Sequence, residues 1–354
     1  MIKKTQDFLV KQKTTVKEVM RYCSKTGQKQ VFVVDKAGCL VGAISDGDIR
    51  RWILKGGSLD ETVGKVCNQA PTTITSNYDL EEVKELLLKE KIEAIPVIDD
   101  QRRILEILTW DMVFAGKVER HREPLNIPVV IMAGGKGTRL DPFTRILPKP
   151  LIPIGDKPVL QIIMDKFAEY EVKEFFLSVN HKAKMIRSYF EDNDAKYRIH
   201  YIEEDTPMGT AGSLVLLKGR IKGTFLVANC DVIIDIDYNE VVKFHKDHGY
   251  DMTVIVSCKR YIIPYGVCEV QGNGVLKSVR EKPEYDFLVN TGMYVMEPKV
   301  LELIPAQKVM DANELIDKLK KKGFSVGVFP IDEKSWIDVG QWEEYQKAVK
   351  ILGG

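Results

Sequence analysis

The sequence predicts an α/β protein in which a mixed, mainly parallel sheet follows a smaller α+β module. Three observations carry this prediction. Residues 127–132 form an uninterrupted apolar run that ends in glycines, the pattern of a strand buried on both faces of a parallel sheet. After that run, predicted strands and helices alternate along the chain, as they do in doubly wound sheets. Residues 14–114 instead contain an internal repeat with an offset of 64 residues.

The composition limits the classes of function. The chain has 354 residues, enough for two domains. Its 52 Lys and Arg residues nearly balance 51 Asp and Glu residues, and the net charge of +1 gives no basic field for nucleic acid or an anionic membrane. The six cysteines form no Cys-x-x-Cys pair, and no stretch approaches a membrane span in length and apolar character. We therefore expect reduced, mostly buried thiols, no nucleic-acid or membrane partner, and a cytoplasmic protein.

The repeat predicts two similar halves of the first module. Superposing the chain on itself places residues 31–35 on residues 95–99. Each copy begins with a helix N-cap signature, Thr15 or Asp79 followed by a glutamate three residues later, and continues with apolar residues at helical spacing. Two β-rich runs follow each helix. Because one such unit cannot cover its own sheet, we expect the two copies to pack face to face.

This repeat resembles a pair of CBS domains, a tandem module that binds adenine nucleotides and tunes an attached enzyme. The resemblance is best in residues 42–49, GAISDGDI, where Ser45 and Asp48 match the ribose and phosphate contacts of that family. The second copy has Thr109 at the position of Ser45 but Met112 at the position of Asp48. The resemblance implies one regulatory nucleotide site, formed by Ser45 and Asp48, and homo-oligomers through the CBS modules. A purely structural or dimerising module is the alternative.

A charged connector separates the two predicted domains. Residues 115–126 carry one glycine and one proline, and Pro124 breaks the helix tail with which the connector begins. We therefore predict a first domain over residues 1–120, with its copies at about 1–60 and 61–120, and a second domain over residues 121–354.

A glycine-rich loop follows the apolar run that begins the second domain. Gly134, Gly135 and Gly137 allow the backbone to turn its N–H groups inward, and such a concavity attracts phosphate oxygens. Arg139 adds a forked cation and Lys149 a point charge, and both suit the anionic tail of a nucleotide. The spacing differs from a P-loop and from a dinucleotide-binding fingerprint.

A long match then identifies a family. Residues 134–140, GGKGTRL, together with Pro142, Thr144 and residues 148–151, PKPL, resemble the signature loop of the sugar-1-phosphate nucleotidyltransferases. The resemblance implies a Rossmann-like nucleotidyltransferase domain. Residues 209–213, GTAGS, resemble the loop that contacts the base in this family. The nucleotide-binding residues that the resemblance implies are Ala133, Gly134, Gly135, Gly137, Thr138, Gly209, Thr210 and Gly212.

Two acids are the candidate metal ligands. Asp231 follows a predicted strand over residues 225–228, so its carboxylate should lie at the carboxyl edge of the sheet, and Asp338 precedes a glycine in the segment WIDVG. Two carboxylates with open water positions suit Mg²⁺ that bridges to phosphate oxygens. The resemblance implies that both hold this metal, and that Asp231 acts in catalysis with Arg139 and Lys149.

Three later segments resemble the sugar side of the family's site. They are the segments around Gly266, around Glu281 and Lys282, and around Asn290 and Thr291. The resemblance implies that Lys282 lies on the phosphate of the sugar, and that Glu281 and Asn290 bond its hydroxyls.

Two histidines lie on one predicted helix without forming a predicted metal site. His245 and His248 share one predicted helix face, and because no third ligand accompanies them we interpret both as surface residues.

These parts imply a reaction. A phosphate oxygen of a sugar-1-phosphate would attack the α-phosphorus of a nucleoside triphosphate (NTP) in line, pyrophosphate would leave, and a nucleoside diphosphate (NDP) sugar would form without a covalent enzyme intermediate. Arg139 would hold the departing pyrophosphate, and Lys149 the α-phosphate or the incoming sugar phosphate. The protein would supply alignment and charge neutralisation.

The domain order narrows the substrates. A CBS pair before a short transferase most resembles the glucosamine-1-phosphate guanylyltransferases of the legionaminic acid pathway, which implies GTP and glucosamine-1-phosphate. The alternatives are a mannose-1-phosphate guanylyltransferase and a thymidylyl- or uridylyltransferase for glucose-1-phosphate. A non-catalytic nucleotide-sensing regulator would not need all four of Arg139, Lys149, Asp231 and Asp338. Too few residues follow Asp338 for the hexapeptide β-helix of some relatives, so no acyltransferase activity is expected.

Overall fold

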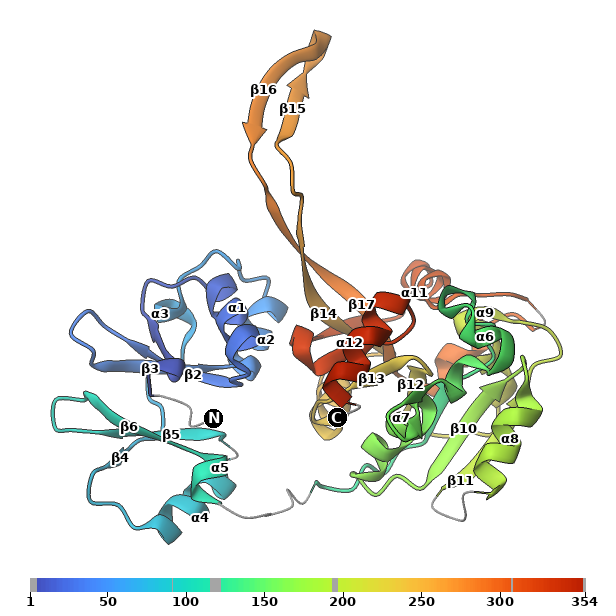
Figure 1. Ribbon diagram of the computed structural model, residues 1–354, viewed down its shortest axis with the longest axis horizontal. Helices are drawn as coiled ribbons and strands as arrows, with labels where there is room; N and C mark the ends of the chain where they lie inside the picture. Colours follow the sequence, from blue (N-terminus) through green and yellow to red (C-terminus); the bar gives the residue numbers. More distant parts are fainter. Residues whose placement is uncertain (1–4, 91, 115–121, 193–196, 307, 353–354) are drawn as a thin grey trace. The chain divides into compact units, whose positions relative to one another are not determined.

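The computed structural model describes residues 5–90, 92–114, 122–192, 197–306 and 308–352. The chain divides into two compact units, Met1–His121 and Arg122–Gly354, each of which is described by itself (Figure 1). The predicted domain boundary at residues 120–121 and the first part of the predicted connector lie outside the described residues. Among the helices in the described part of the chain, none has the length and apolar character that crossing a membrane requires.

The first unit contains the predicted repeat. In each copy, a three-stranded sheet has its first strand parallel to the second and its second antiparallel to the third. The first copy consists of η1 (Thr5–Phe8), β1 (Leu9–Lys11), α1 (Val16–Thr26), β2 (Gln30–Val34), β3 (Leu40–Ser45), α2 (Asp46–Leu54) and α3 (Val63–Val66). The second copy consists of β4 (Ile74–Thr75), α4 (Leu80–Glu90), β5 (Ala94–Ile98), β6 (Ile104–Thr109) and α5 (Trp110–Val113).

A shared apolar cluster joins the two copies. Phe32 and Leu40 of the first copy pack with Ala94 and Ile107 of the second. The Leu40 N–H also donates to the carbonyl of Arg102 at 2.7 Å. Because neither small sheet could bury its apolar face alone, this contact completes the core of the unit. The predicted packing of the two copies is confirmed.

A seven-stranded mixed sheet forms the middle of the second unit. Its order is β11-β10-β7-β12-β17-β14-β18, and of these seven strands β17 alone runs antiparallel to its neighbours. The strands are β7 (Val129–Met132), β10 (Glu174–Val179), β11 (Arg198–Glu203), β12 (Phe225–Asn229), β14 (Met252–Ile262), β17 (Glu284–Met296) and β18 (Val326–Ile331). The predicted mixed, mainly parallel sheet is confirmed.

Apolar layers cover both faces of this sheet. Val129 and Ile131 of β7 lie in one cluster, which includes residues of α7 (Val159–Ala168), α8 (Ala183–Asp192), α10 (Tyr238–Asp247) and α12 (Trp342–Leu352). Val130 and Met132 lie in a second cluster, which includes residues of α11 (Ala312–Lys321). Successive strand residues face opposite sides of a sheet, so a strand covered on both sides must be apolar at each position.

Short elements complete the unit near the carboxyl edge of the sheet. β13 (Val232–Ile234) and β19 (Trp336–Asp338) pair antiparallel, and β8 (Pro153–Ile154) pairs with β9 (Lys157–Pro158). The short helices are α6 (Phe143–Ile146) and α9 (Gly209–Gly212).

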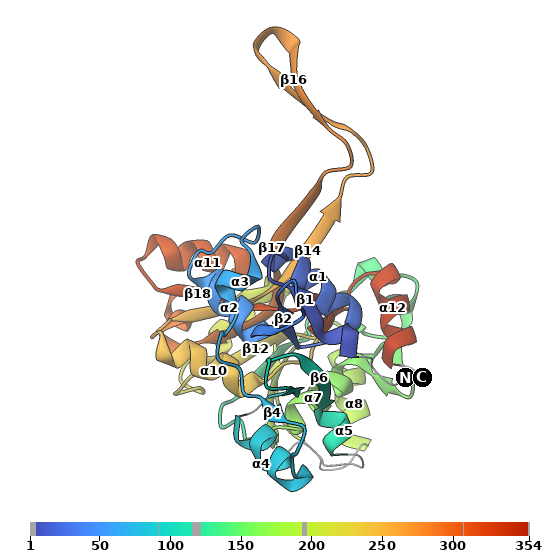
Figure 2. The same ribbon diagram turned by 90° about the vertical axis from the view of Figure 1, so that its left-hand side faces the viewer.

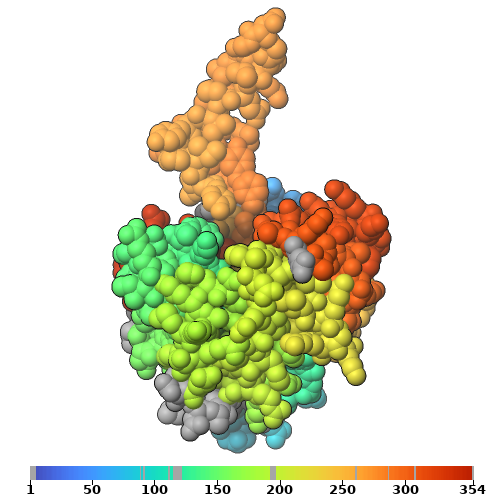
Figure 3. All heavy atoms as spheres, turned by 90° about the vertical axis from the view of Figure 1, so that its right-hand side faces the viewer, coloured from blue at the N-terminus to red at the C-terminus, as the bar shows by residue number. Residues whose placement is uncertain are grey.

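β14 and β17 continue beyond the sheet as a two-stranded ribbon. β14 pairs with β18 only from Met252 to Ser257, but with β17 as far as Ile262. The ribbon ends in the hairpin of β15 (Val267–Gln271) and β16 (Val275–Arg280), and it projects from the body of the unit in all three views (Figures 1, 2 and 3). We call residues 258–288 the arm, and the rest of the second unit the body.

The arm contains two runs whose sequence pattern is typical of antiparallel strands. Residues 267–270 and 275–279 have the apolar pattern of antiparallel additions to the main sheet. They are antiparallel to each other, but they form a separate two-stranded sheet in the arm.

None of the six cysteines, all of which lie in the described residues, forms a disulfide. Cys23, Cys67 and Cys230 are buried, Cys39 and Cys258 are partly exposed, and Cys268 is exposed on the arm. The expectation that most of the thiols are buried therefore holds for only half of them.

Candidate active site

The glycine-rich loop after β7 is packed against the body on one side and open on the other. A Cβ at Gly134 would lie 2.6 Å from Oε1 of Glu204, and a Cβ at Gly137, whose φ is +68°, would lie 2.8 Å from Cβ of Lys149. A Cβ at Gly135 would meet no atom within 4 Å. Gly134 and Gly137 are thus required by the fold, whereas Gly135 leaves open space in which a phosphate could approach the backbone.

The loop ends on the 3-10 helix η2 (Thr138–Leu140), which Ala133 and Gly134 precede. Ala133 is buried, whereas the side chains of Thr138 and Arg139 are exposed. The predicted cation of the loop is therefore accessible to a ligand.

Lys149, Asp231 and Asp338 meet at one point of the body. The ammonium of Lys149 forms an ion pair with Oδ2 of Asp231, and Oδ1 of Asp338 accepts a hydrogen bond from the N–H of Gly340 at 2.7 Å. A Cβ at Gly340 would lie 2.5 Å from Oδ2 of Asp231, 2.8 Å from Oδ1 of Asp338 and 3.3 Å from Nζ of Lys149. The three charged groups therefore surround the same point.

Strand pairing brings the two carboxylates together from distant parts of the sequence. β13 and β19 pair with Val232 opposite Asp338, and the N–H of Val339 donates to the carbonyl of Asp231 at 2.9 Å. Asp231 itself lies just beyond β12, at the edge where the parallel strands end. The structure thus gathers Lys149, Asp231 and Asp338 as the sequence predicts.

Burial strengthens the electrostatics of this cluster. The side chains of Lys149 and Asp231 are each only 12% exposed. Burial, aided by the charge of Asp231, raises the pKa of Asp338 above its usual range, although the N–H of Gly340 and the cations of Lys149 and Arg139 oppose the shift. A second carboxylate beside Asp338 in a partly buried site favours a bound cation.

The thiol of Cys230, next to Asp231, adds no charge to this cluster. Burial raises the pKa of Cys230 to about 12, so the group is a neutral thiol at physiological pH. In the part of the chain that the structure describes, no group of three or more His, Cys, Asp and Glu side chains could hold a metal ion. The pair Asp231 and Asp338 is the candidate metal set that the sequence predicts.

Glu204 is a site residue that the sequence analysis missed. This buried acid follows β11, accepts a hydrogen bond from Ser178 Oγ at 2.6 Å and another from the N–H of Met208 at 3.0 Å, and closely approaches Gly134. It joins the glycine-rich loop, β10 and the segment that leads to α9. Glu204 follows a strand directly, and the position of an acid after a strand is the same sequence signal that predicts Asp231 as a site residue.

The predicted base-contacting loop is α9 and the residues beside it. The N–H groups of Ala211 and Gly212 both donate to the carbonyl of Met310 at 3.0 Å. The hydroxyl of Thr210 accepts from the N–H of Ala312 at 2.9 Å. These bonds hold the loop against the start of α11. Only glycine fits at position 209, because the Cβ of any other residue would lie 2.7 Å from the Met310 carbonyl oxygen.

Two of the predicted sugar-binding residues lie on the body. Asn290 donates from Nδ2 to the hydroxyl of Tyr294 at 2.9 Å, and its Oδ1 accepts from the N–H of Gly292 at 3.0 Å. Thr291 is buried, and its hydroxyl donates to the carbonyl of Ile255 at 2.8 Å. The Thr291 hydroxyl therefore has a partner within the fold, whereas Asn290 remains exposed.

The other three predicted sugar-binding residues lie on the arm. Gly266 and Glu281 face each other across the ribbon, since a Cβ at Gly266 would lie 3.2 Å from Oε2 of Glu281, and Lys282 follows with a φ of +43°. The arm carries all three away from the body (Figure 2). One chain therefore does not bring Gly266, Glu281 and Lys282 together with Lys149 and Asp231.

His245 corrects another expectation. The sequence interpretation places His245 and His248 on the surface, but His245 is 1% exposed. Its Nδ1 lies 2.8 Å from Oγ1 of Thr253, and its Nε2 lies 3.2 Å from Oε1 of Glu297. Burial lowers its pKa below the usual range. His248 is exposed, as expected.

Ser45 and Asp48 of the first CBS copy already form a capping box. Oδ2 of Asp48 accepts from the N–H of Ser45 at 2.8 Å and from its hydroxyl at 2.7 Å, and Ser45 is the N-cap of α2. Thr109 caps α5 in the second copy without a side-chain hydrogen bond, and Met112 is exposed. The two copies therefore differ where the sequence predicts.

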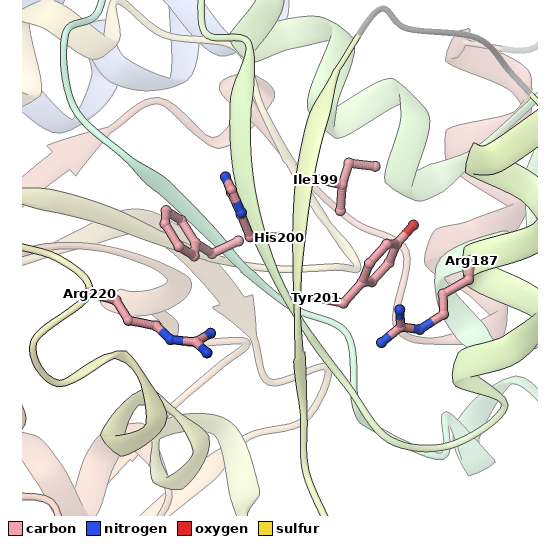
Figure 4. Close-up of a pocket in the computed structure, with 6 residues that line it drawn as sticks. Arg187, Ile199, His200, Tyr201 and Arg220 are labelled. Carbon is pink, nitrogen blue, oxygen red and sulfur yellow. The ribbon is translucent and has the colours of Figure 1, made fainter.

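A further hollow, of about 580 Å³, lies at the outer edge of the main sheet (Figure 4). Its walls are formed by Phe176, Arg187, Ile199, His200, Tyr201 and Arg220. None of these is a predicted site residue, and β10 separates β11, which carries three of them, from β7. The hollow is therefore separate from the cluster around Asp231.

Comparisons with known proteins find similar families for both parts of the chain. The family model described as nucleotidyl transferase matches residues 128–353, and the CBS domain model matches residues 4–55 and 63–115. UTP–glucose-1-phosphate uridylyltransferase from Synechocystis is 30% identical over 241 residues, which are 62% of this chain and 62% of the relative. Mannose-1-phosphate guanyltransferase from Aspergillus oryzae is 33% identical over 226 residues, 61% of each chain. The chain thus spans less than two thirds of the length of these relatives.

A solved structure is also similar to part of this chain. HddC from Yersinia pseudotuberculosis, solved alone and complexed with GMP-PN, is 28% identical to this chain with a TM-score of 0.51. The match covers 64% of this chain and 99% of HddC.

Proposed function

This chain belongs to the nucleotidyl transferase family, and on that premise we propose that it transfers a nucleotidyl group from an NTP to a sugar-1-phosphate. The products are an NDP-sugar and pyrophosphate. The observation that carries the proposal is the convergence of Lys149, Asp231 and Asp338, with Lys149 packed against Gly137 of the glycine-rich loop. Such a cluster provides both positive charge and a cation site for a triphosphate.

The residues then have defined tasks. A phosphate oxygen of the sugar-1-phosphate forms a bond to the α-phosphorus as the bond from that phosphorus to the bridging oxygen of pyrophosphate breaks. Arg139, exposed at the rim, holds the departing pyrophosphate, and Lys149 holds the α-phosphate or the incoming sugar phosphate. No side chain forms a covalent intermediate in this scheme, so the protein contributes alignment and charge neutralisation.

Mg²⁺ is the proposed cofactor, and the residues present fit it. In the bonds that the structure describes, Asp231 uses Oδ2 and Asp338 uses Oδ1, so each carboxylate has a second oxygen available to a cation. Oxygen ligands of this kind suit Mg²⁺ with its remaining positions taken by water and phosphate. When bound, Mg²⁺ supplies neutralisation of the negative charge on the phosphates.

GTP and glucosamine-1-phosphate are the proposed substrates. A guanine nucleotide is favoured by the relatives named mannose-1-phosphate guanylyltransferase and by the GMP-PN complex of HddC. The sugar rests on the order of domains, a CBS pair before a short transferase. Mannose-1-phosphate with GTP is the next candidate, and glucose-1-phosphate with UTP or dTTP follows, because a uridylyltransferase is also among the relatives.

A pyrophosphate-release screen tests the proposal. Purified protein is supplied with each combination of GTP, UTP, dTTP or CTP with glucosamine-1-phosphate, mannose-1-phosphate or glucose-1-phosphate. We expect the highest kcat/KM for GTP with glucosamine-1-phosphate. Preference for another pair would reassign the substrates, and no release with any pair would favour a non-catalytic nucleotide sensor.

Regulation by an adenine nucleotide at the CBS module is a further part of the proposal. Ser45 and Asp48 supply a hydroxyl and an acid, whereas the thioether of Met112 cannot accept hydrogen bonds from two ribose hydroxyls. Calorimetry of the full chain with AMP, ADP and ATP should show one site that Asp48→Ala removes. Because allosteric coupling is typically about 1–3 kcal/mol, the resulting change in KM or kcat should stay within about 150-fold. Binding that Asp48→Ala leaves unchanged would contradict this assignment.

A further inference from the structure

The hairpin of the arm has an apolar face that no described residue of the second unit covers. None of its described residues is buried. Directly opposed residues of a hairpin share a face, so the pairs Cys268 with Val279 and Val270 with Leu276 form one apolar face. Val270, Leu276 and Val279 are 55–67% exposed. The other exposed large apolar residues of the arm are Tyr261, Ile262, Tyr265, Val275, Phe287 and Leu288.

The opposite face of the hairpin is charged. Glu269 forms ion pairs with Arg280 at 2.8 Å and with Lys277 at 3.5 Å. The arm is thus an amphipathic ribbon with one face suited to water and one suited to a protein surface.

A ribbon of this kind needs a further contact. An isolated two-stranded hairpin is marginally stable in water, and stability usually requires a third strand or packing on another surface. β14 has no pairing with β18 beyond Ser257, and the hydrogen bonds and ion pairs that the structure describes for residues 263–283 join residues of the arm to one another.

The arm leaves the body at the edge that carries the candidate site. β12 and β14 are both antiparallel to β17, so β14 runs in the direction of β12 and leaves the sheet at the edge where Asp231 lies. Its register with β17 is unbroken from Val256 to Ile262. The base of the arm therefore continues straight from the sheet, and at 3.3 Å per residue the strand from Ser257 to the tip could extend up to roughly 45 Å.

We propose that two copies of this chain exchange arms, so that the arm of each copy completes the sugar-phosphate side of the other copy's site. This inference rests on the proposed function. The arm carries Gly266, Glu281 and Lys282, the residues that one chain leaves apart from Lys149 and Asp231. A donated Lys282 adds a cation beside the sugar phosphate, and the apolar face of the arm gains a protein surface to pack on.

The chemistry of the chain favours a second copy as the occupant. Each chain has one arm to donate and one site that lacks an arm, so reciprocal exchange closes in a twofold dimer with no unused surface. The net charge of +1 gives no attraction to nucleic acid or an anionic membrane as alternative surfaces for the arm. The oligomers that the CBS resemblance implies are a separate prediction.

Mixed dimers test the exchange. Arg139→Ala removes a charge from the loop but leaves the arm intact. Lys282→Ala removes a charge from the arm but leaves the loop intact. Each variant is expected to be nearly inactive when pure. After co-expression in equal amounts and random pairing, half of the dimers contain both variants, and one of their two sites combines an intact loop with an intact arm. The mixture should therefore recover about one quarter of the wild-type pyrophosphate release.

The matched control is a mixture of Arg139→Ala with Lys149→Ala, both on the body, which should recover no activity. If the arm instead completes the site of its own chain, the mixture of Arg139→Ala with Lys282→Ala recovers nothing, and the exchange is overturned. The exchange is also overturned if Lys282→Ala alone keeps wild-type kcat/KM, or if the active wild-type protein has the mass of a single chain in solution. Failure of the proposed function is distinct, because the wild-type protein would then release no pyrophosphate at all.

A second pair of variants tests the apolar face itself. Val270→Ser and Leu276→Ser change exposed side chains that carry no predicted site role. With exchange, the double variant should raise KM for the sugar-1-phosphate several-fold while the melting temperature of the body stays unchanged. An unchanged KM would contradict the packing of this face on a partner.

Discussion

β14 and β17 pass through two different surroundings. In the body, residues 252–257 of β14 are all buried between β17 and β18. In the arm, the same two strands have no third strand and no buried residue among those described. A close-packed interior restricts side chains to a few rotamers, whereas a solvated ribbon does not. One chain can therefore fix the phosphate side of the candidate site together with Asn290 and Thr291, but it holds the predicted residues Gly266, Glu281 and Lys282 on a solvated ribbon.

The largest effect is expected at the two carboxylates of the body. Asp231→Asn and Asp338→Asn should each abolish turnover, because each removes a proposed charged ligand for Mg²⁺ while keeping the size of the side chain. Pyrophosphate release at saturating Mg²⁺ measures the loss, and circular dichroism checks the fold. Asp156→Asn changes an exposed aspartate of the same unit and serves as the control. Wild-type turnover by either site variant would show that the metal is held elsewhere.

Arg139→Ala and Lys149→Ala should follow, each lowering kcat/KM by roughly 10²–10³. Their effects on stability should differ. Lys149 is nearly buried and paired with Asp231, so its loss leaves a carboxylate unpaired and should lower the free energy of unfolding by up to roughly 3–5 kcal/mol. Arg139 is exposed, and its loss should change that free energy little. Urea unfolding measures the free energy of unfolding of both variants. Equal destabilisation of Arg139→Ala and Lys149→Ala would contradict a stabilising role for the buried ion pair of Lys149 with Asp231.

The two adjacent glycines of the loop distinguish packing from ligand binding. Gly134→Ala would place a methyl group against Glu204 and should lower the free energy of unfolding by about 1–3 kcal/mol. Gly135→Ala meets open space, so it should leave stability within about 0.5 kcal/mol but raise KM for the NTP, because the methyl group lies where phosphate approaches. Thermal melts and NTP titrations of both variants check this. The reverse pattern would mean that the loop binds no phosphate at Gly135.

Much of the body could be predicted because burial sets its pattern. A strand covered on both faces is apolar at each position, so residues 127–132 stand out, and the rule for the carboxyl ends of parallel strands then places Asp231. Glu204 obeys the same rule but escapes prediction, since it follows Glu203 in an acidic run that resembles an exposed turn. His245 follows Val241 and Val242 on the apolar face of α10. This spacing predicts burial, but a histidine is polar and is easily assigned to the surface.

The arm could not be predicted, for a physical reason. Apolar residues at alternate positions indicate a strand with one covered face, but they do not identify the surface that covers it. Residues 267–270 and 275–279 have the same pattern whether the cover is a third strand, the body or another chain. The sugar-side motifs of Gly266 and Lys282 could be recognised, but their separation from Asp231 depends on the path of β14 and β17 beyond Ser257.

The smallest effect is expected at His245, beside the buried end of β14 and β17. Burial lowers its pKa, although Glu297 and Asp251 oppose the shift. Because the folded-state pKa lies below the unfolded value of about 6.5, the unfolded chain binds more protons between the two values. This contribution to stability is present above the unfolded pKa and is lost as pH falls through it toward the folded pKa.

The melting temperature should therefore fall as the pH decreases from about 7.5 to 5.5, and the fall should be smaller in His245→Gln than in the wild type. His248→Gln, exposed on the same helix, should keep the wild-type pH dependence. Equal pH dependence in His245→Gln and the wild type would show that the buried histidine does not link protons to folding of the body, and would weaken the contrast between the two ends of these strands.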